Sequence, residues 1–76
     1  MTRRGRQPNG LRDVLTRGLA AERAAFAARL RARELPEPDI ARRVDALTRM
    51  HAGEAALYGY PDLAQELRSL LPEASR

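Results

Sequence analysis

The chain has 76 residues, enough for one small domain, and without cysteine it can form neither a disulfide framework nor a thiolate metal site. No run of about 18 apolar residues occurs, so a membrane-spanning helix is not expected. The N-terminal arginines are not followed by the apolar core of a signal peptide, and we therefore expect a cytoplasmic protein.

All fourteen basic residues are arginines, and with ten acidic residues they give a formal net charge of +4. Arg3, Arg4 and Arg6 fall in residues 1–9, which have no apolar periodicity and contain turn-forming residues, so we predict a disordered basic tail. Without these three the chain has eleven basic residues against ten acidic ones, which leaves the rest nearly neutral.

The predicted helical domain covers residues 10–72. Asn9 is a candidate N-cap for a first helix that runs to about Arg33. Its apolar positions recur at helical spacing and predict one buried stripe, and Gly18 lies on the same side. The residues of that stripe are Leu11, Val14, Leu15, Leu19, Phe26 and Leu30.

Two prolines in residues 34–38 predict the end of the first helix. Asp39 is a candidate N-cap for a second helix to about Tyr58, which Gly59 would end in the left-handed conformation. Pro61 suits the first turn of a third helix. Its apolar stripe is Leu63, Leu67, Leu70 and Leu71, and Pro72 ends it, so that residues 73–76 should fray.

The sequence thus predicts an all-α fold, a small three-helix antiparallel bundle. A domain of this size buries only about 60% of its unfolded surface. A homodimer in which two copies complete each other's bundle is therefore a further hypothesis.

The second helix carries the chain's only histidine and should have two different faces. The predicted buried face consists of Ile40, Val44, Leu47, His51, Ala55 and Tyr58. The predicted partner-binding face, with charges around very small side chains, consists of Arg42, Asp45, Arg49, Ala52, Gly53 and Ala56. Arg49 would bind carboxylates or phosphates with its planar guanidinium, and Gly53 would let a partner's backbone approach.

A larger pattern extends from this helix into the next. It consists of Gly53, Ala55, Tyr58, Gly59, Tyr60, Pro61 and Leu63. The pattern resembles the histidine phosphotransfer (HPt) domain, whose active helix commonly reads H-x-L-x-G-x-A and is followed by two aromatic residues around a glycine. The resemblance implies a helical bundle that docks on a receiver domain or a histidine kinase of a two-component phosphorelay.

This sequence departs from the HPt pattern at the phosphoacceptor. Four residues before the helix glycine, where the family has its histidine, stands Arg49. His51 occupies a position where the family usually has a buried leucine; it is retained as the candidate phosphoacceptor because the chain has no other histidine. The resemblance therefore implies a signalling adaptor that binds its partner without carrying phosphate.

Other function classes are weakly supported. No metal-ligand cluster, glycine-rich phosphate loop or acid/base carboxylate pair is visible, so we expect a non-catalytic binding module without a cofactor or a metal. The alternative is a small nucleic-acid-associated or transcription-regulating protein that uses its arginine tail. That tail has no aromatic residue to stack on bases.

Overall fold

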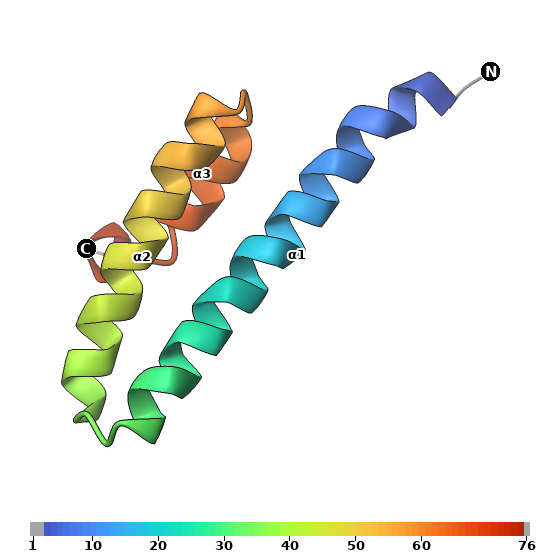
Figure 1. The fold of residues 1–76 in the computed structure, drawn as a ribbon. Coiled ribbons are helices and arrows are strands. Elements are labelled where there is room, and N and C mark those ends of the chain that lie inside the picture. Colours follow the sequence, from blue (N-terminus) through green and yellow to red (C-terminus); the bar gives the residue numbers. More distant parts are fainter. Residues whose placement is uncertain (1–2, 76) are drawn as a thin grey trace.

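The computed structural model describes the backbone of residues 3–75 and the side chains of residues 10–73. Three α-helices, α1 (Arg3–Ala32), α2 (Glu37–Leu57) and α3 (Pro61–Arg68), are followed by a short 3-10 turn, η1 (Pro72–Ser75). The described residues contain no strand. Figure 1 shows α1 and α2 side by side in opposite directions, with α3 folded back along α2. The predicted all-α, three-helix antiparallel bundle is confirmed.

The first helix begins earlier than predicted. It starts at Arg3, so Asn9 lies inside the helix and not at its N-cap. Residues 1 and 2 and the side chains of residues 3–9 lie outside the described part of the chain. The basic tail over residues 1–9 therefore stays a prediction.

The turn between α1 and α2 closes through backbone hydrogen bonds. The Leu35 amide donates to the Leu30 carbonyl over 3.3 Å, and the Glu34 amide donates to the Arg31 carbonyl over 2.8 Å. This Schellman arrangement places Glu34 in the left-handed region with φ 62°. The helix that follows has Pro36 at its N-cap, so the prediction that Asp39 caps it was wrong.

The second helix ends as the sequence predicts. Gly59 has φ 91°, and the Tyr60 amide donates to the Ala55 carbonyl over 2.9 Å, which completes another Schellman motif. Pro61 is the first residue of α3, as expected. Tyr58, however, is exposed, which contradicts its predicted place in the buried face.

The third helix is short and ends at Arg68, before Leu70 and Leu71. Of the four leucines predicted for its apolar stripe, Leu63, Leu67 and Leu71 are buried, whereas Leu70 is exposed. The 3-10 turn Pro72–Ser75 occupies part of residues 73–76, whose fraying stays a prediction.

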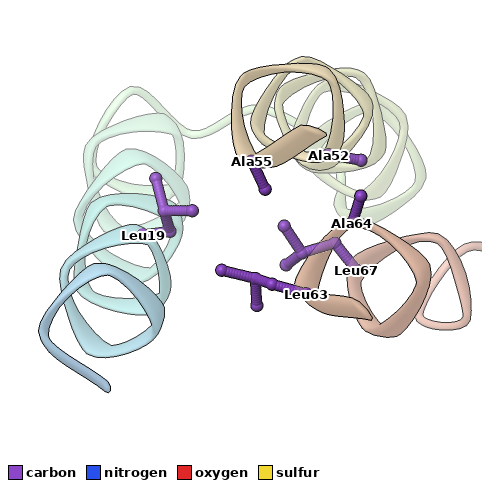
Figure 2. Close-up of a cluster of buried hydrophobic side chains, with 6 residues drawn as sticks. All are labelled: Leu19, Ala52, Ala55, Leu63, Ala64 and Leu67. Carbon is purple, nitrogen blue, oxygen red and sulfur yellow. The ribbon is translucent and has the colours of Figure 1, made fainter. Parts of the chain in front are cut away.

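A compact cluster where the three helices meet forms the core. Figure 2 shows leucine and alanine side chains from each helix converging there: Leu19 from α1, Ala52 and Ala55 from α2, and Leu63, Ala64 and Leu67 from α3. Leu15 and Tyr60 pack against this cluster. Leu11 and Val14 do not reach it, so their predicted burial was wrong.

In the described part of the chain, no helix is both long enough and apolar enough to cross a membrane.

Candidate functional site

The candidate site is on α2, which contributes side chains both to the core and to the surface. Its buried residues are Ile40, Thr48, His51, Ala52 and Ala55. A step of about 100° per residue places a different set on the far side of the helix. We call this set the α2 outer face: Ala46, Arg49, Met50, Gly53, Ala56 and Leu57, all exposed.

His51 points inward, as predicted, and its side chain is only 2% exposed. Two α1 side chains lie against its ring: Arg23 Nη1 is 3.4 Å from Nδ1, and Glu22 Oε1 is 3.5 Å from Nε2. Because a guanidinium only donates hydrogen bonds, the Arg23 contact is a hydrogen bond in the tautomer that leaves Nδ1 unprotonated and places the ring proton on Nε2, toward the Glu22 carboxylate.

This geometry limits what His51 can do chemically. A phosphoacceptor nitrogen must be open to the incoming phosphoryl group, and here each ring nitrogen faces an α1 side chain. A receiver domain would reach His51 only if α1 moved away from α2. Phosphotransfer at His51 stays a prediction, and the structure as it stands favours a packing role.

Arg49 is exposed, as predicted, with 52% of its side chain accessible. It is not free, because Nη2 donates to the Glu73 carboxylate oxygens over 2.7 and 2.9 Å and Nε donates to Oε2 over 3.1 Å. This fork joins α2 to η1 and orients the guanidinium. No sequence signal pointed to a partner 24 residues away.

Ala52 is misplaced in the predicted partner-binding face. It is 1% exposed and belongs to the core cluster, because α3 packs on that side of α2. Asp45 is half-buried, and Arg42 is exposed but hydrogen-bonded to Asp39. Gly53 and Ala56 are exposed, as predicted.

Two large apolar residues of the α2 outer face were missed. Met50 is 61% exposed and Leu57 is 85% exposed. They lie on either side of Gly53, where an added Cβ would meet no atom within 4 Å. The sequence did contain a signal for this face. Intervals of four, three and four residues separate Ala46, Met50, Gly53 and Leu57, and this spacing places them on one side of a helix.

A second polar cluster fastens α1 to α3. Arg12 Nε donates to Asp62 over 2.8 Å, and its Nη2 donates to Glu66 over the same distance. Partial desolvation opposes ionisation of Asp62, but hydrogen bonds from Arg12 and from the Leu63 amide outweigh it, so the pKa of Asp62 lies below its ordinary value. These contacts link α1 to α3 at the surface of the bundle.

Among the described residues, no group of histidine, aspartate and glutamate side chains could hold a metal ion. Comparison with models of known protein families, with curated protein sequences and with solved structures found no match. The geometry of α2 therefore carries the functional argument.

Proposed function

We propose that the protein is a non-catalytic helical adaptor that docks on a receiver domain or histidine kinase through the α2 outer face. The observation that supports this most directly is the exposure of Met50 and Leu57 on the same face of α2 as the exposed Arg49. Methionine and arginine are enriched in protein interfaces. A mixed apolar and cationic surface of this kind fits a partner that presents carboxylates next to an apolar rim.

Gly53 gives this face its shape. A Cβ added at Gly53 would meet no atom within 4 Å, so the α2 backbone is open to solvent there, between the exposed side chains of Met50 and Leu57. A partner helix could bring its backbone close to α2 at this point, while the two larger side chains pack on either side. In the HPt resemblance, the matching glycine serves the same approach.

The Arg49–Glu73 fork gives a specific route to binding. A receiver's acidic pocket would replace the Glu73 carboxylate as the acceptor of the Arg49 hydrogen bonds. Because exposed ion pairs contribute about 1 kcal/mol or less, the exchange costs little. Glu73 thus acts as an internal substitute for a carboxylate of the partner.

The test is titration of the full chain against purified receiver domains by calorimetry. Ala46→Glu places a carboxylate on the docking face and should weaken binding at least about tenfold. Ala41→Glu is the matched control, since Ala41 is exposed on α2 but lies off this face. Arg49→Glu should abolish binding, whereas Glu73→Gln should strengthen it by removing the competing carboxylate.

The nucleic-acid alternative is tested in parallel with duplex DNA over a range of salt concentrations. Phosphate-backbone binding should fall steeply as salt rises, whereas receiver docking with apolar contacts should change less. Steeply salt-dependent DNA binding without any receiver binding would overturn the adaptor proposal. Equal effects of Ala46→Glu and Ala41→Glu would overturn the assignment of the face.

A further inference from the structure

A second unpartnered surface runs along α1. Figure 1 shows α2 and α3 on one side of this helix only. On another side, exposed apolar residues recur at alternating intervals of three and four. We call this set the α1 outer stripe: Leu11, Val14, Gly18, Ala21, Ala25 and Ala28.

The stripe is more than a run of small side chains. Leu11 and Val14 are each 62% exposed, although they are large enough to pack in a core. Gly18 lies in the helix interior, where glycine is less stable than alanine. A Cβ added at Gly18 would meet no atom within 4 Å, so no contact among the described residues accounts for the missing side chain.

The spacing identifies the kind of surface that fits. Alternation of three and four gives a mean period of 3.5 residues, which is the a/d seam of a left-handed coiled coil. Small residues on such a seam bring two helix axes to the short end of the usual 8–10 Å range. The complementary partner is therefore a helix that has the same 3.5-residue repeat and carries small residues at the same levels along its axis.

The charges beside the stripe identify that helix and its direction. With Leu11 at position a, Arg17 is at g and Glu22 at e, and both are exposed. In a parallel, in-register pair, residue g of one helix faces residue e of the next heptad in the other. Arg17 of each copy then faces Glu22 of the other copy, giving two equivalent opposite-charge pairs.

An antiparallel pair lacks this complementarity. In the antiparallel alignment that packs Leu11 and Val14 of one copy against Ala28 and Ala25 of the other, g positions face g positions and e positions face e positions. Arg17 then lies beside Ala24 of the other copy, and Glu22 lies beside Leu15 of the other copy. The parallel register pairs the charges and also buries Leu11 against Leu11 and Val14 against Val14.

We propose that the α1 outer stripe is a homodimer seam, on which a second copy of the chain packs its own α1 in parallel and in register. The seam is separate from the α2 outer face, so each copy keeps its docking surface available. A dimer would then present two such surfaces to its partners. The proposal does not depend on the identity of those partners.

Sedimentation equilibrium of the full chain tests the seam. The wild type should be a dimer, and Ala21→Glu, which places two like charges on the seam, should raise the dimer dissociation constant at least about tenfold. Ala20→Glu is the matched control, because Ala20 is an exposed neighbour on the same helix that lies off the stripe. A wild type that is monomeric at its highest soluble concentration would overturn the proposal, as would equal effects of the two variants.

Charge reversal tests the register. Arg17→Glu should weaken the dimer, and adding Glu22→Arg to the same chain should restore it, because the pair is then reversed and still complementary. Glu22 also lies near His51, so thermal melts followed by circular dichroism must show that each variant folds. A double variant as weak as Arg17→Glu alone would overturn the parallel register.

A cysteine placed on the stripe gives an independent readout, since the chain has none. In the parallel register, residue 21 of one copy lies opposite residue 21 of the other. Ala21→Cys should therefore form an interchain disulfide under mild oxidation, and Ala20→Cys should not. A dimer in which Ala21→Cys forms no crosslink would contradict the proposed arrangement.

Discussion

Truncating Leu63 to alanine should remove a large part of the protein's stability. Leu63 is 0% exposed and lies at the start of α3, where Figure 2 shows it pointing toward Leu19 of α1 and the alanines of α2. It is one of only three leucines in the core cluster. Its side chain therefore joins all three helices.

The expected loss follows from the composition of the core. Buried Leu→Ala changes cost about 2.7–5 kcal/mol, depending on how far the surroundings collapse into the cavity. The other members of the cluster are two leucines and three alanines, and alanine has no side-chain torsion with which to refill space. We expect a loss of about 3–4 kcal/mol. A chain of 76 residues has a total stability of about 4–11 kcal/mol at ordinary values per residue.

Urea unfolding followed by far-UV circular dichroism measures this loss. Leu70→Ala is the matched control, because Leu70 is 61% exposed and its truncation should change stability by about 0.5 kcal/mol or less. All variants are compared at one protein concentration, since dimer formation would make stability depend on it. A loss below about 1 kcal/mol for Leu63→Ala, or equal losses for both variants, would refute the packing described here.

Two further predictions concern the helix ends and the acid limb of stability. Gly59→Ala should destabilise the fold by about 1 kcal/mol, because it forces a Cβ into left-handed backbone. Glu34→Gly should stabilise the fold by about 0.5–1 kcal/mol, because it removes the same strain at Glu34. Urea midpoints that shift in the same direction for both variants would contradict these predictions. The lowered pKa of Asp62 means that the unfolded chain takes up its proton at higher pH than the folded chain does. The resulting stability is fully present above the aspartate pKa of the unfolded chain and is lost as pH falls through the lower pKa of Asp62 in the folded chain. Arg12→Gln should flatten this part of the urea-midpoint profile, and an unchanged slope would show that Arg12 does not lower the pKa of Asp62.

The sequence by itself determined the number and type of the α-helices and three of their six ends, namely the C-termini of α1 and α2 and the N-terminus of α3. Apolar residues recur with a period that suits helices, and prolines and glycines break the chain between them. The left-handed conformation of Gly59 at the end of α2 was predicted from the residue type alone, because glycine has no Cβ and adopts positive φ readily. The inward direction of His51 also followed from periodicity, since its position shares a face with Ile40.

The tertiary structure alone decided which of these faces are covered, and by what. Ala52 has too small a side chain to give a hydrophobic signal, and it is buried only because α3 folds back on that side of α2. Leu11 and Val14 have a strong signal and are nevertheless exposed, because α3 is only eight residues long and α2 and α3 pack on another side of α1. The Arg49–Glu73 fork likewise depends on how the chain returns after α3. Helical periodicity defines which residues share a face, but the neighbour that covers that face is set by chain segments distant in sequence.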